Sequence, residues 1–227
     1  TLHRDDPYLA PHEDALRARL NRAEALSRRL PPPDQSLAEF ANGHEFFGLH
    51  RTDDGWVFRE WAPNAASVTL FGSFSDWQVR DDYALERVGQ NGVWQAHFPR
   101  DAFSHEDLYR LRLSWPGGGG DRIPAYARRV VQDEQSGMFN AQVWAPEQPY
   151  VWRNATPAPQ VGAAYVYEAH VGMATERPTV GTYREFADDI LPRIARAGYN
   201  VVQLMAVLEH PYYGSFGYHV SSFFAAS

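Results

Sequence analysis

Cysteine is absent from the 227-residue sequence, which excludes disulfide bonds and thiolate metal sites. Lysine is absent too, so all 21 basic residues are arginines, a bias to which we attach no function. No run of 18 apolar residues occurs, and we therefore expect no membrane-spanning helix. The segment from Thr1 to Asp6 lacks the apolar core of a signal peptide. Together these absences lead us to expect a cytoplasmic protein.

An excess of positive charge is also missing. The formal net charge is −7, which weighs against nucleic acid or an anionic membrane as the partner. No pair of histidines shows the spacing of a zinc site, so we expect neither metal nor cofactor. With 44% hydrophobic and 22% charged residues the chain is typical of globular proteins, and its length suits one large domain or two ordinary ones.

Aromatic residues, in contrast, are plentiful at 14%, with 7 Trp and 12 Tyr. Flat amphipathic rings can stack on the apolar faces of sugars, but they are also common in the cores of β-sandwiches. Composition alone does not decide between these roles.

The first 41 residues are predicted to form a helical segment. Leucines recur at helical spacing between Pro11 and Leu30, and Pro31-Pro32-Pro33 forbids continuation. Glu13 and Asp14 fall in the first turn and Arg28 and Arg29 in the last, which suits the helix dipole.

Residues 42–148 are predicted to form an all-β, immunoglobulin-like sandwich, since the hydrophobic period changes to two. Tyr109, Leu111, Leu113 and Trp115 share one face of a strand, and Trp94 alternates with its neighbours in a way that favours the core. Turn signals separate the strands, namely Asp53-Asp54-Gly55, Asn91-Gly92 and the run from Pro116 to Gly120.

A proline-rich linker is predicted at 149–163, and 164–227 is predicted to contain a strand–helix–strand unit. The capping box at Thr182 opens a helix with Phe186, Ile190, Ile194 and Ala197 inward. Pro192 predicts a kink or a late helix start, and Gly198 fits the end of the helix. The run from Val201 to Val207 predicts a parallel strand covered on both faces.

Motifs along nearly the whole chain resemble those of glycogen- and starch-branching enzymes of the α-amylase superfamily. The resemblance rests on these stretches: Asp6–Leu9, Phe46–His50, Glu60–Pro63, Gly72–Trp77, Arg122–Tyr126, Tyr167–Gly172, Leu191–Ile194, Gly198–Asn200, Glu209–Tyr218 and Ser222–Ser227. It implies a glycogen-binding type of carbohydrate module followed by the start of a catalytic (β/α)8 barrel. We therefore expect an incomplete barrel at 164–227.

The resemblance implies a glycosyltransferase that cuts an α-1,4-glucan and transfers the released chain to a 6-hydroxyl. Such enzymes retain configuration through two carboxyl groups roughly 5–5.5 Å apart. The family's catalytic acids are expected beyond Ser227. We therefore expect this chain to contain no catalytic residue and to be inactive. Glu168 and Glu209 are expected only to order strand ends, because one carboxylate without a positioned partner cannot run this mechanism.

Tyr218 is the sharpest candidate for substrate binding, since the resemblance implies that this tyrosine stacks on the sugar at the cleavage point. The alternative is packing on neighbouring aromatic rings. His170, His210 and His219 are expected only to supply hydrogen bonds at the same rim.

On the sandwich, Trp61 and Trp77 are the candidate sugar platforms. Trp61 ends a strand before Pro63, an edge at which branching enzymes hold glucan, while Trp77 follows a turn-like segment that favours exposure. Asn91 and Gly92 form a neighbouring hairpin turn and are weaker candidates. Packing within the sandwich is the alternative for all of them.

The expected partner is therefore an α-1,4-glucan such as glycogen, starch or a maltooligosaccharide, and the complete protein is expected to be a monomer. A non-catalytic glycogen-binding module is one alternative, although such a module has no reason to continue into 164–227. A debranching relative of the same superfamily is the other, and its deciding catalytic segments would also follow Ser227.

Overall fold

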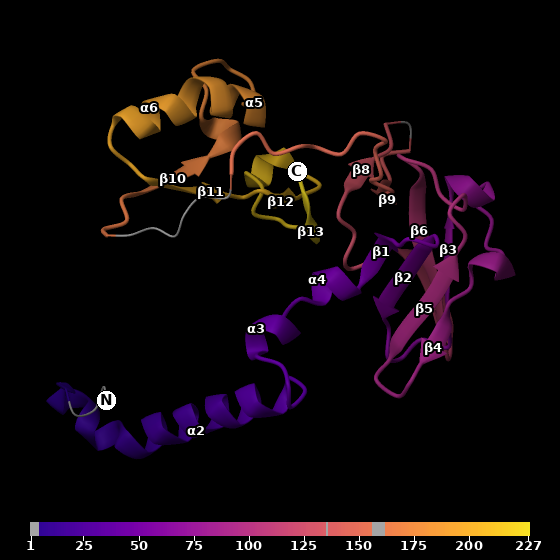
Figure 1. Ribbon diagram of the computed structural model, residues 1–227, viewed down its shortest axis with the longest axis horizontal. Helices are drawn as coiled ribbons and strands as arrows, with labels where there is room; N and C mark the ends of the chain where they lie inside the picture. The colour runs from indigo at the N-terminus through magenta and orange to yellow at the C-terminus, as the bar shows by residue number, and fades with distance from the viewer. Residues whose placement is uncertain (1–4, 135, 156–161) are drawn as a thin grey trace. The chain divides into compact units, whose positions relative to one another are not determined.

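The computed structural model describes residues 5–134, 136–155 and 162–227 (Figure 1). Part of the predicted linker at 149–163 lies outside the described residues. The chain divides into two compact units, the first ending at Phe47 and the second beginning at Gly48, and each is described by itself.

The first unit is helical, as predicted. A 3-10 helix at Pro7–His12 leads into α2 (Glu13–Arg29), whose first turn holds Glu13 and whose last turn holds Arg29. Short helices α3 (Leu37–Phe40) and α4 (Gly43–Phe46) follow. None of the residues of α2 is buried, so its apolar stripe stays accessible. Among the described residues, no helix combines the length and the apolar character needed to cross a bilayer.

The second unit begins with two β-sheets. One has the strand order β1-β2-β5-β4, and the other has the order β3-β6-β9-β8 with β7 paired to β6. All of these pairings are antiparallel. The strands are β1 (Gly48–Arg51), β2 (Trp56–Trp61), β3 (Ser67–Gly72), β4 (Glu86–Val88), β5 (Val93–Phe98), β6 (Leu108–Trp115), β7 (Gly118–Arg122), β8 (Val130–Gln132) and β9 (Phe139–Gln142).

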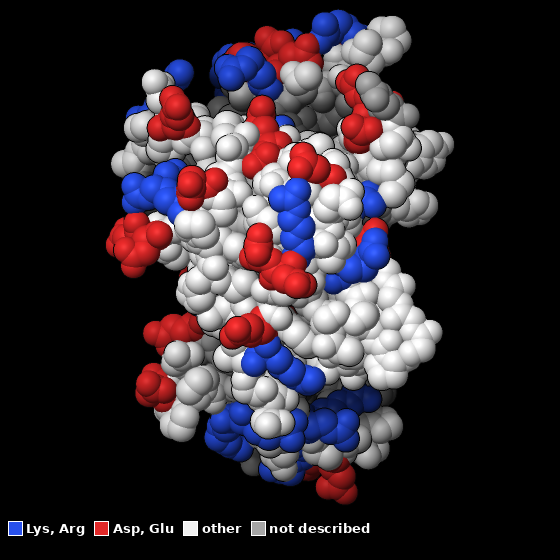
Figure 2. Space-filling model, turned by 90° about the vertical axis from the view of Figure 1, so that its right-hand side faces the viewer, with Lys and Arg blue, Asp and Glu red and all other residues white. Residues whose placement is uncertain are grey.

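One hydrophobic core joins the two sheets, which confirms the predicted sandwich. Alternate residues of β2 and β5 face it, including Phe58 and Trp94, and Leu70 and Leu111 face it from the second sheet. Phe58, Leu70 and Leu111 have no exposed surface at all. On the face shown in Figure 2, acidic and basic side chains are interspersed with wide uncharged areas between them.

The glycine run after Pro116 was predicted as a turn, and most of it is instead a strand. Gly118, Gly119 and Gly120 belong to β7 and pair with the end of β6. The prediction was wrong because glycine has a low strand propensity, and here the backbone pairing offered by β6 overrides it.

The C-terminal part contains the predicted strand–helix–strand unit. β10 (Val166–His170) pairs in parallel with β11 (Val201–Met205), in register from Val166 opposite Val201 to His170 opposite Met205. The capping box at Thr182 is present and opens α5 (Tyr183–Glu185). A π-helical turn, Phe186–Ile190, then precedes α6 (Leu191–Arg196), which carries Pro192 in its first turn. The predicted irregularity at Pro192 is therefore confirmed.

Burial in this part differs from the prediction. Phe186 and Ile194 are buried as expected, but Ala197 is exposed. β11 is not buried on both faces, because Val202 packs against the cluster that contains Phe186 and Ile194, whereas Gln203 and Leu204 are exposed.

A hairpin of β12 (Leu208–Glu209) and β13 (Ser222–Ala226) ends the described chain and reaches the sandwich. Ala225 belongs to the sandwich core, and the ring of Phe224 stacks on Tyr126 with 4.5 Å between their centroids.

Candidate functional site

A groove of about 460 Å³ opens where β2 ends and β6 turns into β7. Its walls come from residues 60–65 and, distant from them in the sequence, from the paired strands β6 and β7 and the segment that follows, namely residues 113–115 and 122–125. The side chains that shape it include Trp61, Pro63, Trp115, Arg122 and Ile123. We call it the Trp61 groove.

Trp61 is the last residue of β2, where the strand leaves the core, and 55% of it is exposed. Its indole Nε1 donates a hydrogen bond of 2.9 Å to the carbonyl oxygen of Asn91. The ring is thus oriented through its polar edge while more than half of the side chain stays accessible. Such an arrangement suits an apolar ligand face.

The hairpin turn between β4 and β5 is pressed against Pro63. Gly92 has φ +78°, and a Cβ atom there would lie 2.5 Å from the Cα of Pro63. The Ala62 amide donates to the Gly92 carbonyl over 2.8 Å, and Arg87 donates to the Pro63 carbonyl over 3.0 Å. The structure therefore brings together Trp61, Pro63, Asn91 and Gly92, four of the residues predicted from the sequence.

Trp115 is an aromatic residue of this groove that sequence reasoning missed as a site residue. It follows the alternation of Leu111 and Leu113, but it lies past the end of the core and is 46% exposed. Its ring lies beside β7, where a Cβ atom at Gly118 would come within 3.0 Å of the indole nitrogen. The run of glycines was the available signal, because a strand without side chains leaves room for a ring beside it.

Beneath the groove lies a carboxylate that is only 1% exposed, that of Glu60. Its Oε1 accepts a 3.1 Å hydrogen bond from the Trp61 amide, and its Oε2 accepts one of 3.1 Å from the Ala125 amide. The guanidinium of Arg122 lies 4.0 Å from Oε1. Burial raises the pKa of Glu60, and the two amides and Arg122 partly offset that rise. Glu60 therefore ties together the walls that carry Trp61 and Arg122.

We expect Glu60 to make the sandwich less stable as the pH rises. Because the pKa is raised in the folded state, protonated Glu60 favours folding below the pKa of the unfolded chain, and this advantage is lost as the pH rises through the folded pKa. Denaturation in urea at a series of pH values from acid to neutral should show the free energy of unfolding of the native chain falling relative to that of Glu60→Gln. Glu86→Gln, on exposed β4, is the matched control. Superimposable pH profiles for the native chain and Glu60→Gln would contradict this reading.

Trp77, the other predicted platform, is exposed as expected but lies elsewhere. Its ring meets the edge of Phe71 at 5.9 Å, and 41% of the residue is exposed. Asp76 and Trp77 both have positive φ, at 53° and 57°. Trp77 is not among the described residues that line the Trp61 groove.

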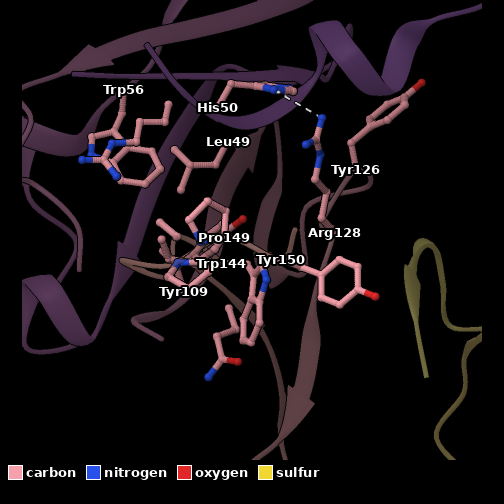
Figure 3. Close-up of a pocket in the computed structure, with 14 residues that line it drawn as sticks. Leu49, His50, Trp56, Tyr109, Tyr126, Arg128, Trp144, Pro149 and Tyr150 are labelled. Atoms are coloured by element: carbon pink, nitrogen blue, oxygen red, sulfur yellow. Dashed lines mark hydrogen bonds between the residues drawn. The ribbon is translucent and has the colours of Figure 1, made fainter. Parts of the chain in front are cut away.

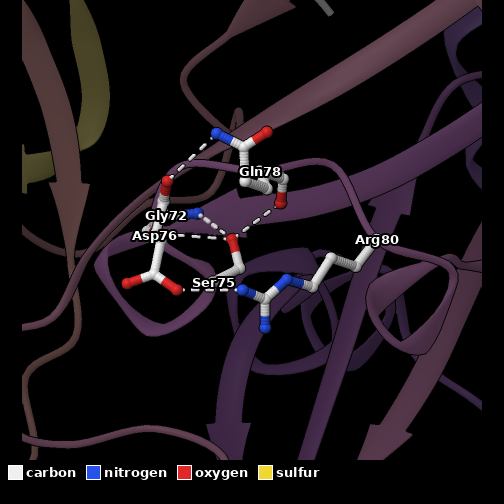
Figure 4. A network of polar contacts seen from close by, with 5 residues as sticks. All are labelled: Gly72, Ser75, Asp76, Gln78 and Arg80. Carbon is white, nitrogen blue, oxygen red and sulfur yellow. Dashed lines mark hydrogen bonds and ion pairs between the residues drawn. The ribbon is translucent and has the colours of Figure 1, made fainter.

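Hydrogen bonds hold this strained turn in place (Figure 4). The hydroxyl of buried Ser75 accepts from the Gly72 amide over 3.1 Å and donates to the Gln78 carbonyl over 2.8 Å. Arg80 pairs with Asp76 at 2.9 Å, and the Trp77 amide donates to the Gly72 carbonyl over 2.8 Å. The turn therefore presents Trp77 in a fixed position.

Tyr218 lies at the carboxyl ends of the parallel strands β10 and β11. Its hydroxyl donates to the sulfur of Met205, the last residue of β11, over 3.4 Å. Its ring centroid is 6.5 Å from that of His170, the last residue of β10, and 61% of the residue is exposed. Ligand sites on parallel sheets are built at this end.

The histidines and acids of this region make local contacts. His170 Nε2 lies 2.7 Å from the Phe216 carbonyl, and His210 Nδ1 lies 3.1 Å from the Leu208 carbonyl. Glu209 accepts from the His210 amide over 3.1 Å, and burial raises the pKa of Glu209. Glu168, in the middle of β10, is exposed.

Comparison with known proteins identifies relatives of this chain. The family described as "Carbohydrate-binding module 48 (Isoamylase N-terminal domain)" matches residues 46–127. The 1,4-alpha-glucan-branching enzyme of Dictyostelium discoideum is 39% identical over 98% of the chain, and that of Yarrowia lipolytica is 41% identical over 99%. The Arabidopsis thaliana protein named "1,4-alpha-glucan-branching enzyme 2-2, chloroplastic/amyloplastic" is 37% identical over the whole chain. The chain covers 33%, 33% and 29% of these three proteins, or about a third of their length.

Solved structures of pullulanases share the fold. The Group B Streptococcus pullulanase SAP matches with a TM-score of 0.63 at 21% identity, covering 80% of this chain and 28% of that one. A Paenibacillus barengoltzii pullulanase in complex with maltohexaose and α-cyclodextrin matches with a TM-score of 0.61 at 18% identity, covering 79% of this chain and 32% of that one. At these identities the likeness concerns the fold alone.

Proposed function

Since the chain belongs to the family of 1,4-alpha-glucan-branching enzymes, we propose that it is the glucan-holding part of an enzyme that forms α-1,6 branches in an α-1,4-glucan. The branching enzymes are 37–41% identical to it over nearly its whole length, whereas the pullulanases share its fold at about half that identity. This difference favours branching over debranching chemistry for the whole protein.

The observation that carries the proposal is the Trp61 groove. Trp61 and Trp115 supply two partly exposed rings, Pro63 supplies an apolar wall, and Arg122 adds hydrogen-bond donors. A glucan chain presents apolar C–H faces to the rings and hydroxyl groups to the donors. Asn91 and Gly92 act through the position they give to Trp61 and Pro63.

Two further roles belong to the same proposal. Trp77 supplies a second, separate platform on its fixed turn. Tyr218 stacks on sugar at the rim of the parallel strands, which are the first strands of a (β/α)8 barrel. In this proposal residues 1–41 are an N-terminal helical segment, 42–148 the glucan-binding sandwich, 149–163 a linker and 164–227 the start of the barrel.

The chain alone is proposed to be inactive, with its catalytic acids beyond Ser227. Retaining transfer needs two carboxyl groups facing one sugar at roughly 5–5.5 Å. Glu168 is exposed in mid-strand, and Glu209 is hydrogen-bonded to the backbone of its neighbour. We propose that neither takes part in that chemistry. A monomeric, cytoplasmic protein remains our expectation.

The test is affinity electrophoresis of the 227-residue chain in gels that contain glycogen. The native chain should be retarded, and Trp61→Ala should raise the apparent dissociation constant about tenfold, because truncating a central aromatic anchor typically costs more than about 1 kcal/mol. Trp77→Ala should weaken retardation less, since its platform is separate.

Tyr165→Ala is the matched control for Trp61→Ala, because Tyr165 is similarly exposed and lies outside the groove. It should migrate like the native chain. Absence of retardation of the native chain, or equal retardation of Trp61→Ala, would overturn the proposal.

A further inference from the structure

A second groove lies at the edge of the sandwich, between β1 and the segment 142–150, which comprises the last residue of β9 and the chain that follows it. Its volume is about 440 Å³, within the range of about 300–1,000 Å³ that is common for small-ligand sites. Among the described residues, none lines both this groove and the Trp61 groove. We call it the Trp144 groove (Figure 3).

Aromatic side chains form both the floor and the rim of the Trp144 groove. Trp56 and Tyr109 are buried core residues that reach it from below. Trp144 and Tyr150 stand at the rim, 53% and 72% exposed. Two exposed aromatic rings therefore stand beside one groove. They offer an apolar ligand face a larger contact area than aromatic residues scattered over the surface would.

The ring of Trp144 is already oriented by the protein. The guanidinium of Arg129 lies 4.3 Å from the ring centroid, and His105 meets the ring edge-on at 4.7 Å. His105 in turn accepts a 3.3 Å hydrogen bond from the Ala145 amide. Little side-chain entropy remains to be lost when a ligand binds against such a ring.

The polar lining suits hydroxyl groups. His50 and Arg128 lie 3.5 Å apart on the side of the groove opposite Trp144 (Figure 3), and Gln142 lies in its wall. No carboxylate is among the described lining residues, so a cationic ligand is disfavoured. Imidazole, guanidinium and amide groups together offer donors and acceptors over a short distance.

We propose that the Trp144 groove is a second binding site for a segment of α-1,4-glucan. The rim rings take the apolar sugar faces, and His50 with Arg128 takes the hydroxyls. This inference rests on the proposed function, since it supplies a second point at which the sandwich holds the same polymer. Two grooves on one sandwich would bind a branched polymer with avidity beyond that of either groove alone.

The experiment follows each tryptophan separately. The full chain is labelled with 5-fluorotryptophan, and the ¹⁹F signals of Trp61 and Trp144 are assigned from Trp61→Phe and Trp144→Phe. Titration with maltoheptaose should shift both signals. In Trp61→Ala the Trp144 signal should still shift. In Tyr150→Ala the dissociation constant obtained from the Trp144 signal should rise about five- to tenfold, and the dissociation constant obtained from the Trp61 signal should be unchanged. Tyr165→Ala should change neither titration.

The outcomes separate the two proposals. A shift at Trp61 with none at Trp144 overturns the second site and leaves the proposed function standing. A Trp144 shift that disappears in Trp61→Ala is an indirect effect and also overturns it. No shift at either tryptophan overturns both proposals.

Discussion

Replacing Gly92 by alanine is expected to abolish glucan binding at the Trp61 groove and to destabilise the sandwich by about 2–5 kcal/mol. Gly92 has φ +78°, a backbone conformation that is unfavourable for alanine, and the new Cβ atom would lie 2.5 Å from the Cα of Pro63. Because the contact is with backbone, no rotamer change can relieve it. The turn and Pro63 must separate, and Trp61 then loses its hydrogen bond to Asn91.

Gly89→Ala is the matched control, because Gly89 lies in the same hairpin turn with φ +63° but a Cβ atom there would meet nothing within 4 Å. This substitution should cost only the conformational part, about 1–2 kcal/mol, and leave binding unchanged. Urea denaturation and glycogen-gel retardation of both variants provide the measurements. If Gly92→Ala bound glycogen as Gly89→Ala does, the close approach of the turn to Pro63 would not shape the groove.

Replacing Phe58 by alanine is expected to lower the free energy of unfolding of the sandwich by about 3–5 kcal/mol, through lost burial and the cavity that remains. Phe58 has no exposed surface, and its ring meets that of Tyr109 edge-on at 6.4 Å, across the two sheets. The loss is a large part of the roughly 5–15 kcal/mol that stabilises a typical domain.

Phe223→Ala is the control for this substitution, since Phe223 is 68% exposed on β13. It should change the free energy of unfolding by no more than about 0.5 kcal/mol. Both variants are compared by urea denaturation followed through tryptophan fluorescence. Equal losses in the two variants would mean that Phe58 is not at the centre of the core.

The parts of the fold that followed from the sequence are those in which local signals and packing agree. The acidic start, basic end and proline stop of α2, the alternation of β6 and the capping box at Thr182 each predicted an element that the structure contains. β7 was missed because its glycines carry no strand preference, and pairing with β6 is a non-local effect. The burial of β11 was overestimated because an apolar run indicates where cover is needed, not whether the described chain supplies it.

The site was predictable where one strand end determined it. Trp61 was a candidate because it ends a strand before Pro63 and because the resemblance to branching enzymes points to this edge, and the hairpin beside it supplies the Asn91 carbonyl that its indole contacts. Trp115 was missed because the alternation of Leu111 and Leu113 along β6 assigns it to the core. Only the structure shows that the core ends before Trp115, which is therefore partly exposed. The Trp144 groove was missed because β1 and the segment 142–150 are far apart in the sequence.

The three stretches that wall the Trp61 groove meet only in the closed sandwich, so a ligand that binds there has no site on the unfolded chain. By mass action, such a ligand raises the stability of the sandwich by about 2.7 kcal/mol at a hundredfold excess over its dissociation constant. The polymer would then stabilise the folded state of its own binding domain. Chains bound to glucan would unfold less often, whereas unbound chains would have only their intrinsic stability.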